Sequence, residues 1–263
     1  MSPVNITNPQ KKPEYGLYVG YSIIITLLVL GIAGLILFIF GFNVASYLNI
    51  IFWTIGALLI VTCLWPGIGM LSTNRSMQKG KELHFDFLKK ANNAKILDCG
   101  CGTGRHAIPL AKQMSKGSFL TGIDIYDTQS ISVNSLQRVQ KNAEIEGVSD
   151  RTKFTVGSVA DIPFDNETFD IVTCMGVMHE VGKLKSKAFQ EIHRVLKPEG
   201  LFYFRELKRL ALAPFIGVWA FFTLKSEAYW EKELKNGQFK LVGRYTGGNY
   251  YEFLATKILK VSN

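Results

Sequence analysis

The stretch Ile96-Leu97-Asp98-Cys99-Gly100-Cys101-Gly102-Thr103-Gly104 decides the fold of this 263-residue chain. A short apolar run ends in an acidic residue, and three glycines follow at alternate positions. Residues 105–111 then begin an amphipathic pattern, so the order predicts a strand, a tight turn and a helix. A strand that leads into a glycine-rich turn at a helix N-terminus is typical of the nucleotide-binding crevice of an open parallel sheet.

The glycine spacing argues against two common nucleotide sites. In the dinucleotide fingerprint G-x-G-x-x-G the third glycine would stand at position 105, but that residue is Arg105. The G-K-[ST] of a phosphate-binding loop is absent. The remaining D-x-G-x-G-x-G resembles the first motif of the class I S-adenosylmethionine-dependent methyltransferases. In that cofactor a methionine replaces the pyrophosphate, and its ammonium group needs oxygen acceptors. A purely structural glycine-rich turn is the alternative interpretation.

Strand and helix patterns alternate from Lys95 to the end of the chain, which predicts an α/β fold. The expected strands are residues 95–97, 118–125, 151–157, 169–174, 201–205, 238–245 and 250–258. The expected helices include residues 129–146 and 183–196. Val133, Leu136, Val139 and Ala143 show helical spacing in the first of these, Gly147 ends it, and Asp127 is the expected cap.

Three further motifs strengthen the resemblance, which covers roughly residues 95–206. Residues 157–170 resemble the G-D-A-x-x-L-P-F-x-x-x-x-F-D run of small-molecule methyltransferases in this family. Residues 177–181 resemble their V-L-H-H-V, and residues 191–200 resemble their E-x-x-R-V-L-K-P-G-G. The resemblance implies a Rossmann-like, seven-stranded methyltransferase sheet with helices on both faces, and S-adenosylmethionine as the cofactor.

The resemblance also implies which residues hold the cofactor. Asp124 ends the second strand and is expected to hold the ribose hydroxyls, as an acid does in dinucleotide folds. Ser158 replaces the family's usual Asp, so adenine recognition falls to its hydroxyl and to Val159, with Asp161 a further candidate. The other candidates are Asp98, Gly100, Cys101, Gly102 and the Cys174 backbone for the methionine end, and Ile125 against adenine. No metal is expected.

The residues after the fourth strand are candidates for catalysis. Glu180 stands where the family has a second His, next to His179. Together they could form a base near the transferred methyl group, since His and Glu are common proton acceptors. The structural alternative is that His179 orients a loop and Glu180 caps the next helix.

The first part of the chain has a different character. Residues 15–74 contain no Asp, Glu, Lys or Arg. A bilayer core needs about 20 apolar residues per helix, and residues 17–40 and 50–71 both supply such a run. Two spans joined by a short uncharged turn are the prediction, with a pair of buried core helices as the alternative. Gly31 and Gly34 could allow the two helices to approach closely.

Basic residues predict the orientation of this hairpin. Lys11 and Lys12 precede the first span, and Arg75, Lys79 and Lys81 follow the second, whereas the connecting turn has none. Because positive residues stay on the cytoplasmic side, both ends of the hairpin are expected to face the cytoplasm. The predicted protein is therefore an integral membrane protein with a cytoplasmic catalytic domain.

The sequence divides into four parts: a tail over residues 1–14, a transmembrane hairpin over 15–74, a linker helix over 75–93 and a methyltransferase domain over 94–263. Within that domain, residues 208–236 form an apolar insertion. Its core, Leu210 to Leu224, is too short to span a bilayer and is flanked by cations. A lid that lies in the membrane interface and an ordinary buried helix are both open.

Composition narrows the partners. The formal net charge is +9, so an anionic surface is a plausible neighbour. The four cysteines lack the spacing of a zinc site or a disulfide framework. We expect a membrane-anchored methyltransferase that acts on a lipid or other amphiphilic small molecule, and no nucleic acid. The alternatives are a methyltransferase of soluble small molecules or membrane proteins, and a non-enzymatic cofactor-binding scaffold subunit.

Overall fold

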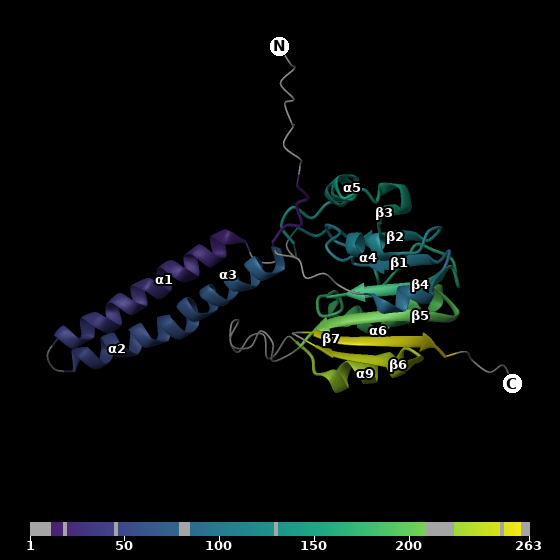
Figure 1. Ribbon diagram of the computed structural model, residues 1–263. Helices are drawn as coiled ribbons and strands as arrows, with labels where there is room; N and C mark the ends of the chain where they lie inside the picture. Colours follow the sequence, from purple (N-terminus) through teal and green to yellow (C-terminus); the bar gives the residue numbers. More distant parts are fainter. Residues whose placement is uncertain are drawn as a thin grey trace, which may run out of the picture.

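The computed structural model describes residues 12–17, 20–44, 47–78, 85–128, 131–208, 224–247 and 250–258. A helical hairpin extends to one side of an α/β domain (Figure 1). The hairpin elements are α1 (Tyr21–Phe40), the 3-10 turn η1 (Gly41–Asn43), α2 (Leu48–Leu59), the π-helical turn η2 (Ile60–Leu64) and α3 (Trp65–Gln78).

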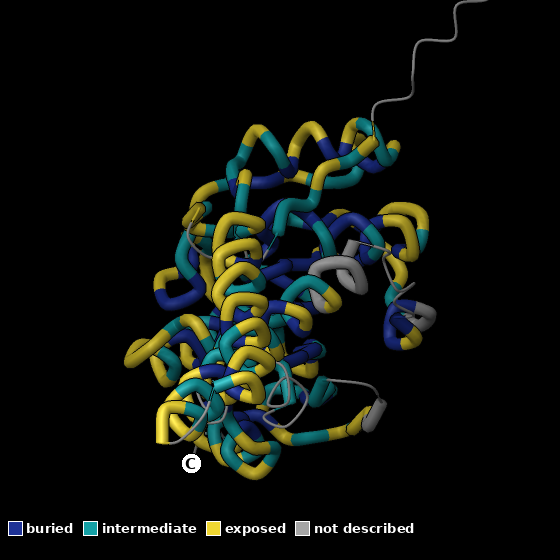
Figure 2. The backbone as a smooth tube through the Cα atoms, turned by 90° about the vertical axis from the view of Figure 1, so that its left-hand side faces the viewer, coloured by how far each residue is buried: buried dark blue, intermediate teal, exposed yellow. Residues whose placement is uncertain are grey.

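The two arms of the hairpin are long and apolar enough to cross a membrane by length and composition. Buried residues make up 17% of the most apolar window in the first arm and 6% in the second. Figure 2 shows the same contrast, with exposed residues along the hairpin and buried residues in the sheet. The helices touch through glycines: a Cβ on Gly31 would lie 2.4 Å from the Leu64 Cα, and one on Gly34 would lie 2.5 Å from the Leu59 Cβ.

The α/β domain contains one seven-stranded sheet in the order β3-β2-β1-β4-β5-β7-β6. β1 to β5 are parallel, and β7 runs antiparallel to both of its neighbours. The strands are β1 (Lys95–Cys99), β2 (Phe119–Asp124), β3 (Thr152–Val156), β4 (Phe169–Met175), β5 (Leu196–Leu207), β6 (Phe239–Gly247) and β7 (Tyr250–Lys257). The order of the strands reverses between β1 and β4, and such a switch point creates a binding crevice at the carboxyl ends of the strands.

Helices cover both faces of the sheet. The apolar sides of α4 (Ala107–Gln113) and α5 (Leu136–Ile145) share one buried cluster with the 3-10 turn η3 (Asp86–Lys90). The second cluster, on the other face, contains side chains of α6 (Lys185–Val195) and α9 (Glu227–Asn236). The short 3-10 turns η4 (Ser149–Arg151) and η5 (Gly182–Leu184) complete the described elements.

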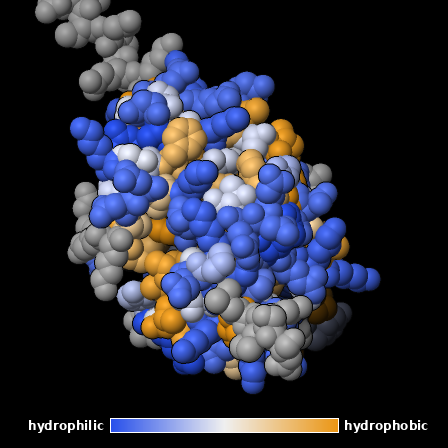
Figure 3. All heavy atoms as spheres, turned by 90° about the vertical axis from the view of Figure 1, so that its right-hand side faces the viewer, coloured by the Kyte–Doolittle hydropathy of each residue, from blue (hydrophilic) through white to orange (hydrophobic). Residues whose placement is uncertain are grey.

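The carboxyl edge of the sheet faces the hairpin. The carboxyl ends of the parallel strands point to the side on which the hairpin lies (Figure 1). The opposite side of the domain is mainly hydrophilic, with scattered apolar residues (Figure 3). The switch point and the apolar hairpin therefore lie on the same side of the molecule.

Several predicted boundaries were wrong. The first apolar helix begins at Tyr21, because Leu17 is hydrogen-bonded to Ser132 of the α/β domain. In the predicted linker helix 75–93, α3 continues to Gln78, and the described residues after it form only the 3-10 turn η3. The predicted helix 129–146 begins at Leu136, capped by Ser135 rather than Asp127, and ends before Gly147 as expected. Within the predicted insertion 208–236, residues 209–223 lie outside the described residues, and α9 is an ordinary helix packed on the sheet.

Candidate active site

The glycine-rich turn follows β1 directly, at the switch point. Gly100, Gly102 and Gly104 all have positive φ, so each needs a residue without a Cβ. A Cβ on Gly100 would lie 2.3 Å from a methyl carbon of Val177. The backbone N–H groups of Gly100 and Cys101 both donate to the carbonyl of Ile123, at 2.8 and 3.0 Å. These bonds fix the turn against the end of β2.

Asp98 lies at the end of β1, buried beneath this turn. Its carboxylate accepts a hydrogen bond from the Thr173 hydroxyl at 2.6 Å, and the residue is 2% exposed. Burial raises the pKa of Asp98 to about 7, although the Thr173 hydrogen bond opposes that change. A cation beside Asp98 would favour its ionised form, which is the property that an ammonium-binding group needs.

Asp124 links the two loops of the site. Its Oδ2 accepts the backbone N–H of Gly102 at 2.8 Å, and its Oδ1 accepts the backbone N–H of Tyr126 at 2.6 Å. The Nδ2 of Asn134 also donates to Oδ1, at 3.3 Å. The Oδ1 of Asn134 is buried and has no hydrogen-bond partner among the residues that the structure describes. A buried polar atom of this kind calls for an explanation, and a ligand donor near Gly102 would supply one.

The next candidate residues lie at the carboxyl ends of β2 and β3. Ile125 is 65% exposed directly after β2, so its apolar side chain is accessible to a ligand at the end of that strand. Val159 is buried, and the Ser158 hydroxyl accepts the backbone N–H of Ala160 at 3.2 Å. The Ser158 hydroxyl therefore shapes its own turn in addition to any contact with a ligand.

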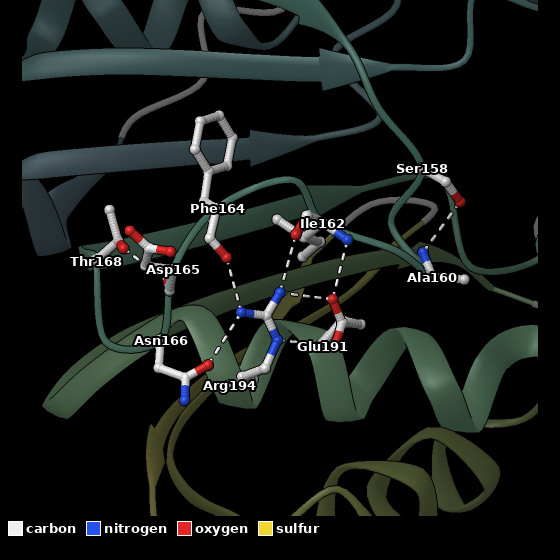
Figure 4. Close-up of polar contacts among 9 residues, drawn as sticks. All are labelled: Ser158, Ala160, Ile162, Phe164, Asp165, Asn166, Thr168, Glu191 and Arg194. Carbon is white, nitrogen blue, oxygen red and sulfur yellow. Dashed lines mark hydrogen bonds and ion pairs between the residues drawn. The ribbon is translucent and has the colours of Figure 1, made fainter.

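An ion pair on α6 holds the loop that carries Ser158 (Figure 4). The Arg194 guanidinium donates to the carbonyls of Ile162 at 2.9 Å and Phe164 at 2.7 Å. Glu191 binds Arg194 and also accepts the backbone N–H of Ile162 at 3.0 Å. The E-x-x-R part of the fourth motif is therefore structural in this chain: it positions the loop after β3.

The three cysteines of the site are buried thiols. Cys99 and Cys174 are register partners on β1 and β4, and Cys101 lies in the turn. Burial raises the pKa of each thiol well above its usual value, so these side chains stay protonated and unreactive. The candidate cofactor contacts among them are therefore Cys101, in the turn, and the backbone of Cys174, without any reactive thiol chemistry.

His179 lies in the turn after β4 and contacts an acid on a different strand. Its Nδ1 is 2.9 Å from the Oε2 of Glu206, at the end of β5. The other oxygen of Glu206 accepts the backbone N–H of Met178 at 2.6 Å, and the residue is fully buried. Burial lowers the pKa of His179, but the hydrogen bond and the charge of Glu206 outweigh it, so the net pKa is raised.

Glu180 has a weaker place in this group. Its carboxylate is 3.7 Å from Nε2 of His179, beyond hydrogen-bond distance, and its side chain is exposed to solvent. Neither η5 nor α6 has a side-chain cap, so the structural alternative in which Glu180 caps the next helix was wrong. In the structure His179 therefore pairs closely with Glu206 and not with Glu180.

Sequence reasoning missed two residues of this arrangement. Glu206 follows the apolar residues of β5 after one intervening residue, Arg205, whereas Asp98 follows those of β1 directly, so the signal was present but weaker. Asn134 lies in a loop with no motif around it, and nothing in the sequence marks it.

A surface hollow lined by Asn92, Asp170 and Lys197 lies at the amino ends of β4 and β5. It is therefore at the opposite edge of the sheet from the candidate site residues.

A family model described as a methyltransferase domain matches residues 90–256, which is more than half of the chain. The chain belongs to this family. The match covers the sheet from β1 to all but the last residue of β7, and it places the chain among the class I S-adenosylmethionine-dependent methyltransferases, with S-adenosylmethionine as the cofactor.

Curated relatives share part of the domain. A demethylmenaquinone methyltransferase of Lactiplantibacillus plantarum is 35% identical over 108 residues, 41% of this chain and 43% of the relative. A sterol 24-C-methyltransferase of Gibberella zeae is 36% identical over 108 residues, 41% of this chain and 26% of the relative. The matched stretches thus span less than half of each relative.

Solved structures show the same fold. A S-adenosylmethionine-dependent methyltransferase of Aquifex aeolicus aligns with a TM-score of 0.55 and 15% identity, covering 70% of this chain and 88% of that one. One of Methanosarcina mazei aligns with a TM-score of 0.54 and 20% identity, covering 68% of this chain and all of that one. At these identities the likeness concerns the fold alone.

The described residues fit the cofactor. Asp98 is a buried carboxylate with no cationic partner among the described residues, and it lies next to a glycine-rich turn. Asn134 presents an unpaired buried oxygen beside Asp124, and Ile125 presents an uncovered apolar surface. These three features match an ammonium group, hydroxyl donors and a flat apolar ring in turn.

Proposed function

We propose that this protein is a membrane-anchored methyltransferase that transfers a methyl group to a lipid or another amphiphilic small molecule at the cytoplasmic face. The observation that carries the proposal is the placement of the exposed apolar hairpin on the side toward which the carboxyl ends of β1 to β5 point (Figure 1). A soluble protein would bury two helices of this length and composition, whereas very few residues of the second arm are buried.

The relatives support the choice of acceptor. Their names give demethylmenaquinone and sterol methylation, and both substrates are lipid-like. An acceptor of that kind resides in the bilayer, so an enzyme that uses it gains from being held at the membrane. The basic residues at both ends of the hairpin favour a cytoplasmic domain.

The cofactor, when bound, supplies a methyl group made electrophilic by the sulfonium. The chain's own residues position the reactants and exclude water. Asp98, Gly100, Cys101, Gly102 and the Cys174 backbone are proposed to hold the methionine end. Asp124 is proposed to hold the ribose, with Ile125, Ser158 and Val159 at the adenine end.

His179 is the proposed proton acceptor. Glu206 keeps a hydrogen on Nδ1, so Nε2 is the basic nitrogen of the neutral ring. An acceptor that carries a hydroxyl or an acidic carbon-bound hydrogen would release its proton to Nε2 as its new bond to the methyl carbon replaces the bond between that carbon and the sulfonium sulfur, which would leave as a neutral thioether. Glu180, near Nε2, would then stabilise the imidazolium.

One reconstitution experiment tests the proposal. The full-length protein is placed in vesicles of extracted native lipids with cofactor labelled in the methyl group, and Asp124→Ala serves as the cofactor-binding control. Label in the lipid fraction supports the proposal. Label confined to soluble small molecules or to membrane proteins would favour those acceptors instead. Cofactor binding with no transfer to any fraction would favour a scaffold subunit.

A further inference from the structure

The segment just before the first apolar helix lies on the α/β domain. We call residues Glu14 to Leu17 the strap. The backbone N–H of Leu17 donates to the Ser132 hydroxyl at 2.8 Å, and the backbone N–H of Ser132 donates to the carbonyl of Leu17 at 2.9 Å. This reciprocal pair joins the strap to the loop between β2 and α5.

The middle of the strap is held by the glycine-rich turn. The Thr103 hydroxyl donates to the carbonyl of Tyr15 at 2.8 Å. The Arg105 guanidinium donates to the carbonyls of Tyr15 at 3.2 Å and Gly16 at 3.0 Å. Arg105 stands where a dinucleotide fingerprint would have its third glycine. In this chain its charge-assisted hydrogen bonds hold the backbone of the strap.

The start of the strap is fixed by α5. The Asn142 side chain accepts the backbone N–H of Glu14 at 2.9 Å and donates to its carbonyl at 2.8 Å. The same amide donates to the carbonyl of Thr103 at 2.9 Å, and Asn142 is almost completely buried. The Glu14 carboxylate also pairs with Arg138 at 2.6 Å.

Gly16 makes this docking specific. It has a φ of +69°, where side chains are disfavoured. A Cβ at this position would lie 2.1 Å from the carbonyl oxygen of Ser132 and 3.0 Å from a methyl of Ile131. The backbone can approach the loop this closely only because residue 16 is glycine.

We propose that the strap is part of the cofactor site and sets the spacing of the two loops that hold the cofactor. The strap joins the glycine-rich turn to the loop after β2 through its bonds to Thr103 and Ser132. Asp124 makes a second link between the same two loops, because its carboxylate accepts the Gly102 N–H. This inference rests on the proposed placement of the cofactor between those loops. Because α1 begins at Tyr21, the strap also couples cofactor binding to the position of the hairpin.

Coupling of this kind is reciprocal. If the docked strap favours cofactor binding, then bound cofactor must favour the docked strap. The test therefore measures both directions in the full-length protein in detergent micelles. Affinity for S-adenosylmethionine is measured by calorimetry, and hydrogen exchange is followed at the Ser132 amide, whose acceptor is the carbonyl of Leu17.

Gly16→Ala is expected to weaken cofactor affinity at least tenfold. The matched control is Gly20→Ala, because a Cβ there meets nothing closer than the Ser22 hydroxyl at 3.6 Å; its affinity should stay within twofold of the parent's. Thr103→Val removes one strap hydrogen bond while keeping the shape of the side chain, and should weaken affinity several-fold. Cofactor should slow exchange at Ser132 in the parent and lose that effect in Gly16→Ala.

Two results would overturn the inference in different ways. If Asp124→Ala loses cofactor affinity while Gly16→Ala and Thr103→Val keep it, the strap is only a tether. If Asp124→Ala binds cofactor as well as the parent does, the placement of the cofactor is wrong and the strap proposal fails with it. Should Gly16→Ala not fold, Thr103→Val and the exchange at Ser132 decide alone.

Discussion

The carboxylate of Glu206 lies 2.9 Å from Nδ1 of His179, although the two residues come from different strand ends of the sheet. A carboxylate only accepts hydrogen bonds, so Nδ1 carries a hydrogen and the ring presents Nε2 to the site. The second oxygen of Glu206 is held by the Met178 N–H at 2.6 Å. The imidazole is therefore oriented by a buried group that itself cannot rotate freely.

Replacing Glu206 tests this orientation. Glu206→Gln removes the negative charge that raises the pKa of His179, so that pKa falls. Since a base works when it is unprotonated, the rise of activity with pH should move to lower pH. We expect kcat to fall about 10- to 100-fold, less than the roughly 100- to 10,000-fold contribution of a general base, because the base itself stays in place; KM for the cofactor should change little. The measurement is kcat and KM against pH.

Glu180→Gln is the comparison for that experiment. It removes a charge near Nε2 but keeps the hydrogen bond at Nδ1, so its effect on the pH profile should be the smaller of the two. An unshifted profile in Glu206→Gln, with a loss of kcat alone, would contradict a positioning role and indicate general destabilisation.

Asp98 predicts a pH dependence of cofactor binding. Burial raises the pKa of this carboxyl to about 7 in the absence of a cation. An ammonium group beside it favours the carboxylate, so binding should release a proton near neutral pH. Affinity for S-adenosylmethionine should therefore weaken as pH falls below about 7, by up to about tenfold per pH unit. Calorimetry in buffers with different ionisation enthalpies measures the released proton, and Asp98→Asn should abolish the release.

Replacing Arg194 should lower the stability of the α/β domain and loosen the loop after β3. Arg194→Ala removes hydrogen bonds to two carbonyls of the loop after β3 and leaves Glu191 without its partner. We expect the free energy of unfolding to fall by about 2–3 kcal/mol, typical of losing bonds to a charged group. Urea unfolding measures it. Arg194→Lys should recover only part of the loss, because an ammonium cannot reproduce the planar fork.

Much of the site could be predicted because an acid after an apolar run marks the carboxyl end of a parallel strand. Asp98 and Asp124 follow this pattern, and the structure brings them to one switch point. Glu206 follows it less closely, because Arg205 separates it from the apolar run, and its importance depends on His179, 27 positions earlier in the chain. Their contact arises because β4 and β5 are neighbours in the sheet, which the pattern along the chain does not specify.

Long-range contacts also explain the main errors. Val133 fits the helical spacing of Leu136 and Val139, yet it has a φ of +59° and lies outside α5. The loop around it turns away to pair with Leu17, 115 positions earlier than Ser132. Leu17 itself continues an apolar run in the sequence and was therefore assigned to the first span. Local periodicity cannot detect a pairing of this kind.

The stability of the hairpin should depend on the glycines at which its helices touch. Gly34→Val would force side-chain carbons against the Leu59 side chain, since a Cβ at position 34 would lie only 2.5 Å from the Leu59 Cβ. We expect a loss of about 1–3 kcal/mol, the scale of overpacking. Thermal unfolding in micelles measures it. Leu35→Val, one position along on an exposed side chain, is the matched control and should change stability far less.

The last prediction concerns the side of the membrane on which the site lies. Cys63 is replaced by Ala because it is partly exposed, whereas the other three cysteines are buried. A cysteine at Asn43, exposed at the tip of the hairpin, should then be labelled by an impermeant reagent added outside intact cells. A cysteine at Gln78, at the end of α3, should react only after permeabilisation. This follows because basic residues flank both ends of the hairpin and none lies in the turn.

Labelling of position 78 in intact cells, with position 43 protected, would put the α/β domain outside and contradict the proposed cytoplasmic enzyme. Labelling of both positions only after permeabilisation would indicate that the hairpin does not cross the bilayer, so that its apolar surface must be covered in another way.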